Sequence, residues 1–412
     1  MKKHLLALAL ACAALIHTPA ATAAPPRPAL VAGFSVERLK RLDAAIDEQI
    51  AQQQLAGAVM VVARDGKPVV FKAYGQSDIE NAKPMRTDTI FRIASMSKAL
   101  TTVAAMLLYE EGRFLLKDPV SRYLPAFANL QVALPGGGTE KLHRPLTIHD
   151  LLTHTAGMSY GPGPAQAAYQ KAGLTDWYLV GNDETLATWA DRFAALPLQS
   201  QPGEQFIYGY ATDVLGRLVE VVSGQPLDRF IKTRITDPLR MPDTSFFLPP
   251  DKIARLANVY GLENGQLKLM ETPAQSDFVN GPRKLLSGGA GMLSTAGDYT
   301  RFLQMLLNRG ELDGVRLLAP KTVALMTADH LGPKSRGDAD GFGLGFWVNV
   351  RTGGFTELGS EGAFGWGSAY FPQYTVDPKE RLVILFMTQL RPAGNSTLHL
   401  RVRGLTYQAL MH

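Results

Sequence analysis

Residues 94–100 read ASMSKAL, and they open a long apolar run, TTVAAMLLY. The run predicts a buried helix from Ser95 to Glu111. A lysine at the head of such a helix is at least partly removed from water. On a helix, residues three apart share a face, whereas adjacent residues point in different directions. Lys98 is therefore placed beside Ser95 and not beside its direct neighbour Ser97.

Ser95 and Lys98 have the residue types that nucleophilic catalysis needs. A serine hydroxyl attacks poorly until a base removes its proton, and a lysine is a base when burial and neighbours lower its pKa. A serine at a helix start also has a backbone N–H that is available to an oxyanion. The alternative is structural: Ser95 caps the helix and Lys98 extends to water. The S-x-x-K pattern alone does not decide between them.

A second serine competes for the role of nucleophile. Residues 157–161, GMSYG, match the G-x-S-x-G pattern with Ser159 at its centre. In α/β-hydrolases that serine lies between a strand and a helix. Here a helix-like end, LLTHTA, precedes it, and GPGPA follows, which does not begin a helix cleanly. The sequence context therefore disfavours Ser159.

The order of the expected elements indicates the fold. Residues 35–53 have the apolar spacing of an amphipathic helix, and β-rich runs flank the hairpin signal Asp65-Gly66. Residues 113–284 contain mostly helix-like pieces, and strand-like runs such as RLVILFMTQ return near the end. We expect an α/β (α+β) fold. Its central antiparallel sheet is built from strands at both ends of the chain and flanked by helices, with a mostly helical domain inserted.

The expected domains are a discontinuous sheet domain, residues 25–115 plus 285–412, and an inserted helical domain, residues 116–284. Hydrophobic residues make up 46% of the chain and charged residues 19%, which is typical of a packed globular protein. The formal net charge of +5 is small for 412 residues, and lysine and arginine form no long run. We therefore expect no nucleic-acid partner.

Residues 1–23 have the pattern of a signal peptide: two lysines, a short apolar stretch and an A-x-A cleavage site. The apolar stretch is too short to span a bilayer, so we expect export to the periplasm or secretion, without stable membrane insertion. Cleavage after Ala23 would remove the single cysteine, Cys12. The mature chain would then have no thiol nucleophile. The oligomeric state is left open.

Five blocks together resemble the serine β-lactamase-like hydrolases, a family that includes class C β-lactamases, D-Ala-D-Ala carboxypeptidases and family VIII carboxylesterases. The blocks are FRIASMSKALT, EEGRFLLKDPVSRYLPAF, LTIHDLLTHTAGM, PGEQFIYGYATDVLGRLVEVVSGQPL and SGGAGMLSTAGDYTRFLQMLL. The resemblance covers nearly all of residues 35–412 and is strongest to the esterases. It implies the fold expected above and an acyl-enzyme on Ser95.

The resemblance also implies further site residues. Tyr208 stands where the family has its second catalytic residue, so the implied catalytic group is Ser95, Lys98 and Tyr208. Whether Lys98 or Tyr208 is the base stays open. Tyr210 stands where β-lactamases have an asparagine that binds a substrate amide, and it is expected to contact substrate.

The third family motif, Lys-Thr-Gly in β-lactamases, corresponds here to Trp366-Gly367-Ser368. These three residues are expected to bind substrate, with an uncertainty of one or two positions in the frame. The backbone N–H groups of Ser95 and Ala369 are the expected oxyanion hole.

Trp366 carries no charge where the β-lactamase lysine would meet a substrate carboxylate. A small neutral ester therefore fits this pattern better than a β-lactam. Arg283, Lys284 or Arg351 could restore a cation from a loop. The alternatives are a β-lactamase or D,D-peptidase, an acyltransferase or amide hydrolase, and a non-catalytic binder.

The sequence indicates no metal or cofactor. It contains no H-E-x-x-H and no paired cysteines, and its histidine pair His149 and His154 is interpreted as structural because the spacing of five does not suit one helix face. The expected partner is a small-molecule ester or β-lactam substrate.

Overall fold

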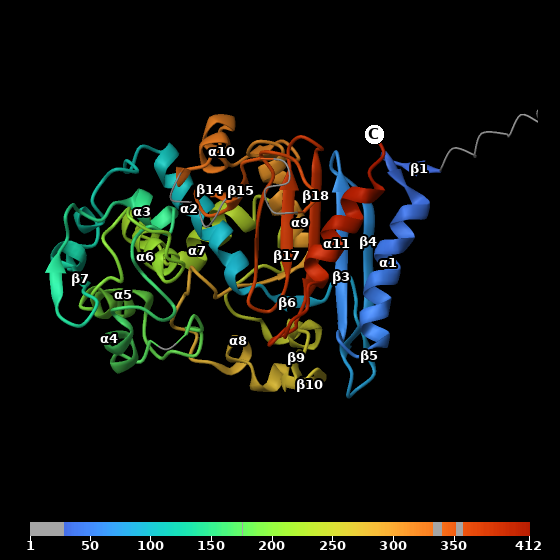
Figure 1. Cartoon of the computed structure of the whole chain (residues 1–412), viewed down its shortest axis with the longest axis horizontal. Helices are drawn as coiled ribbons and strands as arrows, with labels where there is room; N and C mark the ends of the chain where they lie inside the picture. Colours follow the sequence, from blue (N-terminus) through green and yellow to red (C-terminus); the bar gives the residue numbers. More distant parts are fainter. Residues whose placement is uncertain (1–28, 175, 333–339, 352–356) are drawn as a thin grey trace, which may run out of the picture.

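The computed structural model describes residues 29–174, 176–332, 340–351 and 357–412; the predicted signal peptide lies outside them. Its main element is an eight-stranded sheet in the order β14-β15-β16-β17-β18-β3-β4-β5. Every neighbouring pair in this sheet is antiparallel. A helical region lies beside the sheet (Figure 1).

The two ends of the chain meet at the centre of the sheet. Strand β3 (Gly57–Arg64) lies between β4 (Lys67–Asp78) and β18 (Leu382–Thr388). Leu382 pairs with Arg64, so the register joins residues more than 300 positions apart in the chain. The expected fold class, a sheet built from both ends of the chain, is confirmed.

The turn between β3 and β4 is the one that the sequence predicts. Asp65 and Gly66 have φ angles of 52° and 74°. Both lie in the left-handed region, as a two-residue type I′ turn requires, and its twist matches that of the flanking strands. The other strands of the sheet are β5 (Lys83–Pro84), β14 (Asp340–Phe342), β15 (Trp347–Asn349), β16 (Phe364–Gly367) and β17 (Gln373–Asp377).

Helices cover both faces of the sheet. Helix α1 (Val36–Ala51) and helix α11 (Leu398–Ala409) lie side by side on one face (Figure 1), and α9 (Ala296–Leu307) packs on the other. In β3, Met60 and Val62 belong to the core under α1 and α11, whereas Val59 and Val61 belong to the larger core on the opposite side. Strand β3 is apolar without alternation because both of its faces are covered.

The region between the two halves of the sheet is mostly helical. Its helices are α3 (Ile148–Leu152), α4 (Gln166–Lys171), α5 (Leu186–Ala194), α6 (Ala211–Ser223), α7 (Leu227–Ile231), a π turn (Lys232–Thr236) and α8 (Asp277–Asn280). Its 3₁₀ turns are Val120–Arg122, Pro125–Asn129, Pro250–Arg255 and Pro273–Gln275. Two small hairpins, β7 (Gln131–Ala133) with β8 (Thr139–Lys141) and β9 (Val259–Glu263) with β10 (Gln266–Glu271), complete it.

Short elements join these parts. They are β1 (Leu30–Val31), β2 (Phe34–Ser35), β6 (Ile90–Arg92), β11 (Leu293–Thr295), β12 (Glu311–Leu312), β13 (Val315–Arg316) and α10 (Pro320–Met326). None of the helices in the described ranges has both the length and the apolar character needed to cross a membrane.

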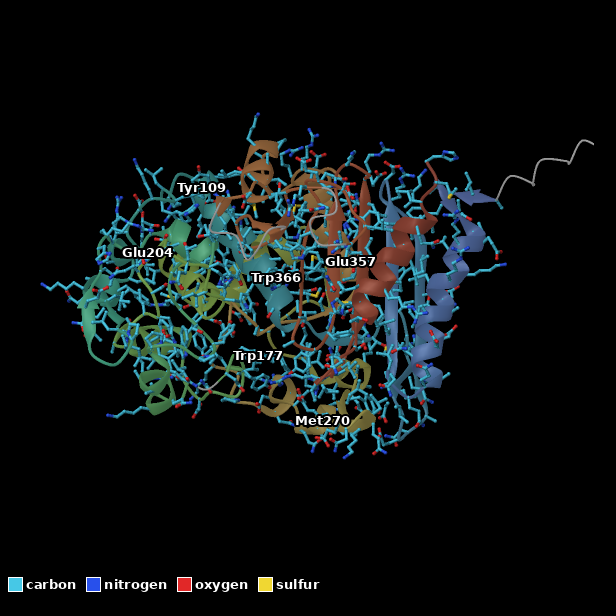
Figure 2. The ribbon with its side chains drawn as sticks, viewed as in Figure 1. Tyr109, Trp177, Glu204, Met270, Glu357 and Trp366 are labelled. Atoms are coloured by element: carbon cyan, nitrogen blue, oxygen red, sulfur yellow. The ribbon has the colours of Figure 1, made fainter. Side chains whose placement is uncertain are left out.

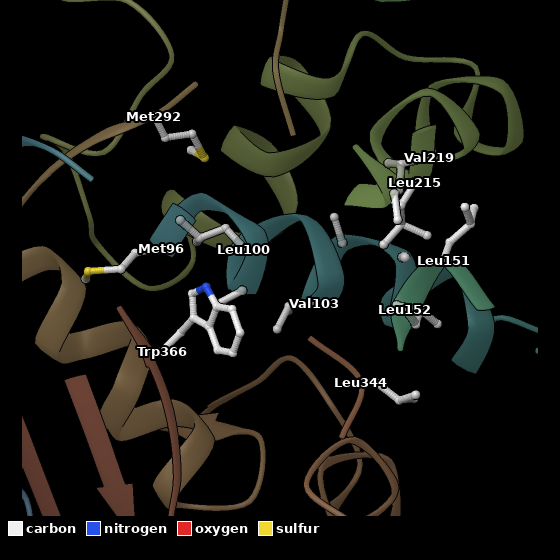
Figure 3. Packing of buried hydrophobic residues seen from close by; sticks show 14 of the residues in the cluster. Met96, Leu100, Val103, Leu151, Leu152, Leu215, Val219, Met292, Leu344 and Trp366 are labelled. Atoms are coloured by element: carbon white, nitrogen blue, oxygen red, sulfur yellow. The ribbon is translucent and has the colours of Figure 1, made fainter. Parts of the chain in front are cut away.

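Helix α2 (Ser97–Glu110) lies at the junction of the two regions. Its residues from Ser97 to Leu108 are all buried, and it packs against α6. Figure 3 shows this helix with Leu100 and Val103 on it and Trp366 beside its first turns. A helix surrounded by protein has no solvated face, which explains the continuous apolar run. The helix was expected to start at Ser95, but α2 begins at Ser97, because residues 94–96 form a 3₁₀ turn.

Candidate active site

A cavity of about 440 Å³ lies beside the first turn of α2. Both the helical region and the sheet contribute to its walls. Its lining residues are Ser95, Tyr160, Trp177, Tyr208, Trp347, Trp366, Gly367, Ser368, Ala369, Gln373, His399, Leu400 and Arg403. Six residues predicted from the sequence are among them: Ser95, Tyr208, Trp366, Gly367, Ser368 and Ala369. Aromatic side chains dominate the lining, which favours an apolar substrate.

Ser95 is held at the cavity by a strained piece of backbone. The residue before it, Ala94, is fully buried and has a φ of 35°, which an alanine rarely adopts. Such strain persists only where the surrounding packing imposes it, and it is concentrated at functional sites. Ser97, in contrast, is fully buried, and its hydroxyl accepts a hydrogen bond from the Met292 N–H at 3.1 Å. Of these two serines, only Ser95 faces the cavity.

Lys98 is buried, with 2% of its surface exposed, and does not extend to water. Its ammonium donates to the carbonyl of Gly289 at 2.9 Å and to the hydroxyl of Tyr160 at 3.3 Å. The ammonium also lies 4.6 Å from the centre of the Tyr208 ring and 5.2 Å from that of Tyr160. Oxygen acceptors and aromatic faces replace the hydration that the charge loses on burial.

Tyr208 contacts Lys98 through its ring and Trp366 through its hydroxyl. Trp366, on β16, donates its indole N–H to the Tyr208 hydroxyl at 3.2 Å. The ring of His154 lies 4.8 Å from that of Tyr208 on another side. Since the Tyr208 oxygen accepts from the indole, its own proton can point toward another acceptor. The structure thus brings Ser95 and Tyr208 to one cavity, with Lys98 buried behind it against the Tyr208 ring, although the tyrosine is more than a hundred positions away in the chain.

Sequence reasoning missed Tyr160, the second tyrosine of the cluster. Its ring lies 5.6 Å from that of Tyr208 at an angle of 82°, and its hydroxyl accepts from Lys98. Tyr160 directly follows Ser159 in the G-x-S-x-G match at residues 157–161. Ser159 itself is structural: its hydroxyl accepts from the Gly161 N–H at 2.9 Å, and a helix, α3, precedes it where the hydrolase elbow would need a strand.

Two glycines allow this close packing. A Cβ on Gly209, between the tyrosines at 208 and 210, would lie 1.9 Å from the carbonyl oxygen of Met158. A Cβ on Gly289 would lie 2.6 Å from a carboxylate oxygen of Asp213 and 2.9 Å from the Tyr160 hydroxyl. No real Cβ sits so close to other atoms. The tyrosines and the lysine can therefore pack together only with glycine at these two positions.

Asp213 is a fully buried carboxylate behind this cluster, and sequence reasoning missed it too. One of its oxygens accepts from the Ser287 hydroxyl at 2.6 Å and from the Gly289 N–H at 3.0 Å. Burial raises the pKa of Asp213, against the opposing effect of the nearby Lys98. Burial, and then the Asp213 carboxylate, hold the pKa of Tyr160 well above its usual range.

Tyr210 does not occupy the position that the sequence predicts for it. Its side chain is fully buried and does not line the cavity, and its hydroxyl donates to the backbone carbonyl of Asp176 at 2.6 Å. Its ring packs edge-on against Tyr160 at 4.5 Å and in a tilted arrangement against Phe193 at 5.5 Å. The expectation that Tyr210 contacts substrate is therefore wrong. The reason is that the residue immediately precedes α6 and its side chain is turned into the helical core.

The residues expected to form the oxyanion hole lie at the same cavity. Trp366 and Gly367 end β16, which lies against the 3₁₀ turn that carries Ser95. The Ser368 hydroxyl accepts from the Tyr370 N–H at 3.3 Å, which shapes the turn around Ala369. Ala369 lines the same cavity as Ser95.

The far wall of the cavity comes from α11 and was not expected. His399 and Arg403 both line it. The guanidinium of Arg403 lies 5.5 Å from the centre of the Trp347 ring, and it donates to the Leu358 carbonyl at 3.3 Å. Burial lowers the pKa of His399, with a smaller contribution from Arg403.

The three cations considered from the sequence lie elsewhere. Arg283 donates to two backbone carbonyls of its own region, and Lys284 forms an exposed ion pair with Asp183. Arg351 is exposed, and none of the three lines the cavity. The cation at this cavity is Arg403, which the sequence did not distinguish from the other arginines near the C-terminus.

A metal site is not evident in the described ranges, where no three His, Cys, Asp or Glu side chains gather closely enough to hold an ion. His149 instead contacts His330, with Nε2 and Nδ1 separated by 3.1 Å, and burial lowers the pKa of His149. His154 is packed among aromatic rings beside Tyr208.

Comparisons with known proteins agree with this architecture. Protein Rv1367c of Mycobacterium tuberculosis is 36% identical over 357 residues, which cover 82% of this chain and 86% of that protein. Esterase EstB of Burkholderia gladioli is 32% identical over 391 residues, covering 89% of this chain and 94% of EstB. The solved structure of EstCE1, a hydrolase with promiscuous acyltransferase activity, matches with a TM-score of 0.78 and 28% identity. That match covers 90% of this chain and 98% of EstCE1.

The sequence profile of the β-lactamase family matches residues 42–407, which include the sheet, the inserted helical region and the whole cavity. Together with the relatives above, this match confirms the resemblance stated from the sequence. The chain belongs to the β-lactamase family of hydrolases.

Proposed function

We propose that this protein is a serine hydrolase that cleaves short-chain carboxylic esters through an acyl-enzyme on Ser95. The observation that carries the proposal is the cluster around Lys98: an S-x-x-K serine at a cavity, a buried ammonium and two tyrosines. The likeness to EstB, an esterase, and to EstCE1, a hydrolase, supports it.

In the first step the Ser95 oxygen attacks the ester carbonyl, and the pair Tyr208 and Lys98 takes the serine proton. The negative charge that develops on the carbonyl oxygen is stabilised by the backbone N–H groups of Ser95 and Ala369. The tetrahedral intermediate then collapses. The carbon–oxygen bond to the alcohol breaks, and the alcohol leaves with the proton that the pair had taken.

In the second step a water molecule attacks the acyl carbon. The same pair accepts a proton from this water and returns it to the Ser95 oxygen, so the acid is released and the enzyme is regenerated. Tyr208 and Lys98 act as a coupled pair, so the accepted proton belongs to the pair and not to one residue.

The residues around Tyr208 favour an ester over a β-lactam. Trp366 places an uncharged indole where the β-lactamase motif has a lysine, and this indole is engaged with Tyr208. Tyr210, which stands where an asparagine would read a substrate amide, is buried in the core.

Arg403 supports a second candidate. A guanidinium in the cavity wall suits the carboxylate of a β-lactam or of a peptide C-terminus, so hydrolysis of those substrates is the alternative function. Acyl transfer to an alcohol is a further alternative, supported by the acyltransferase activity of EstCE1. We further propose that the protein is exported, on the basis of its first 23 residues.

A serine-directed fluorophosphonate should form one covalent adduct, and peptide mass spectrometry should place it on Ser95. Ser95→Ala should abolish labelling. Ser97→Ala and Ser159→Ala should retain it, because those hydroxyls are used by backbone N–H groups and do not line the cavity. An adduct on either of those serines, or no adduct on the folded wild type, would contradict the assignment.

Steady-state kinetics should separate the two candidate substrates. We expect kcat/KM for 4-nitrophenyl butyrate to exceed that for a chromogenic cephalosporin by about 100-fold, because the motif lysine is absent. Ser95→Ala should lower ester turnover by about 10³-fold or more. A higher kcat/KM on the cephalosporin would favour the β-lactamase alternative instead.

Asp213→Asn should move the acidic limb of the kcat/KM profile to lower pH by about one to two units. The pair that accepts the Ser95 proton must first be unprotonated, and the negative charge of Asp213 favours the protonated form of its neighbours. The neutral amide removes that effect. The charged and titratable groups that interact with Asp213 are Lys98, Tyr160 and Tyr210.

Asp298→Asn is the matched control for this experiment. Burial raises the pKa of Asp298 to about 6, but its carboxylate accepts from the Asp243 N–H and the Thr244 hydroxyl and does not line the cavity. Its replacement should leave the acidic limb in place. An unchanged limb in Asp213→Asn would show that Asp213 carries no charge that the catalytic pair senses.

A further inference from the structure

We propose that Trp177 is the specificity-determining wall of the Ser95 cavity, where its indole limits the length of the acyl chain, and that Arg391 and Tyr210 position it. This inference rests on the proposed ester hydrolysis and names the feature that selects its substrates. Trp177 belongs to the connection between α4 and α5, whereas Arg391 follows β18 in the sheet domain.

The half-buried indole of Trp177 packs against residues of the sheet domain. The guanidinium of Arg391 lies 4.8 Å from the ring centre, within the range of a cation–π interaction. The ring of Tyr370 meets the indole edge-on at 5.7 Å and 89°. Trp177 and Ala369 pack together against a small core that contains Ala94 and Tyr370. Trp177 therefore shares a packing unit with the neighbour of the nucleophile and with the predicted oxyanion residue.

The backbone on both sides of this contact is also fixed. The Arg391 N–H donates to the Tyr260 carbonyl at 2.6 Å, and the Leu390 N–H donates to the Tyr370 carbonyl at 2.9 Å. These bonds hold the guanidinium-bearing loop against β9 and against the turn that follows β16. Arg391 can therefore act as a stable platform for the indole.

The inserted domain holds the other side of Trp177. The Tyr210 hydroxyl donates to the Asp176 carbonyl at 2.6 Å, and the Asp176 carboxylate accepts from the Tyr178 N–H at 2.7 Å. The Tyr178 ring packs edge-on against Trp177 at 5.6 Å. Tyr210, which sequence reasoning assigned to substrate contact, thus acts through the backbone immediately before Trp177.

Charge and polarity indicate which part of the substrate meets this wall. The part of the lining that α11 supplies includes the polar side chains His399 and Arg403, whereas Trp177, Tyr160 and Tyr208 contribute aromatic rings from the helical region. Contact with the aromatic rings costs an apolar acyl chain less desolvation free energy than contact with Arg403, because no water is displaced from a charged group. Figure 2 shows Trp177 below Trp366, near the border between the helical part and the sheet.

The test compares 4-nitrophenyl acetate, butyrate, hexanoate, octanoate and decanoate as substrates, so that only the acyl chain changes. Trp177→Ala should raise the ratio of kcat/KM for octanoate to that for butyrate by about 10-fold or more, since each methylene that fits an apolar pocket changes selectivity by roughly this factor. Most of the change should be in KM for the long chains.

Two further variants test the positioning residues. Arg391→Gln removes the cation and should shift the same ratio in the same direction, whereas Arg391→Lys retains a cation and should shift it less. Tyr210→Phe removes only the hydroxyl and should act like Arg391→Gln, with an unchanged pH profile. Phe71→Ala is the matched aromatic control, because Phe71 is 45% exposed on β4 and does not line this cavity.

The outcomes separate this inference from the proposed function. If the wild type hydrolyses none of the esters, the proposed function fails. If it hydrolyses them but Trp177→Ala and Trp177→Phe, both folded by thermal melting and both labelled by fluorophosphonate, keep the wild-type chain-length profile, the wall assignment fails. A uniform loss on all chain lengths would also overturn it, because a structural defect does not select by length.

Discussion

The burial of one ammonium group constrains the whole site. Lys98 is surrounded by protein at the start of α2, where Gly289 and Tyr160 supply oxygen acceptors, Tyr208 supplies an aromatic face and the buried Asp213 lies nearby. Each of these partners comes from a different segment of the chain. The requirement to solvate Lys98 therefore draws together the segments that form the cavity around Ser95.

The sheet supplies the rigid side of this arrangement. Because β18 pairs with β3 along its length, the C-terminal strands are fixed relative to the N-terminal segment that leads to Ser95. Strand β16 then places Trp366 against Tyr208 and carries the turn that contains Ala369 toward the nucleophile. A catalytic constellation works only if such supports hold it within a fraction of an ångström, and here a sheet and a buried helix provide them.

Much of the fold could be predicted because local signals were strong. The Asp65-Gly66 turn, the amphipathic spacing of α1 and the apolar runs of β3 and β18 each have a direct physical meaning. Helix spacing placed Lys98 beside Ser95, whereas Tyr208 came from the family resemblance, since no local rule brings together residues a hundred positions apart. The error at Tyr210 has a physical origin: its place beside Tyr208 suggested the cavity, but the side chain enters the core of the helical region.

Tyr160, Asp213, Trp177 and Arg403 could not be selected from the sequence, because their importance depends on tertiary contacts. Tyr160 directly follows Ser159, and the motif there indicated the serine hydroxyl and not the tyrosine. Asp213 lies within an ordinary amphipathic helix pattern. Arg403 is one of several arginines near the C-terminus. Only the packing of α11, β16 and the inserted region against one another shows which of these side chains reach the cavity.

The central claim is that the hydroxyl of Ser95, the Lys98–Tyr208 pair and two backbone N–H groups surround one reacting carbon. A crystal structure of the protein inhibited by a fluorophosphonate tests it most directly, because the phosphonyl group imitates the tetrahedral intermediate. The account predicts a bond from phosphorus to Ser95, with the phosphonyl oxygen within hydrogen-bonding distance of the N–H groups of Ser95 and Ala369. It also predicts the Tyr208 hydroxyl beside the Ser95 oxygen. A phosphonyl oxygen directed away from both N–H groups, or a Tyr208 hydroxyl out of reach of Ser95, would contradict it.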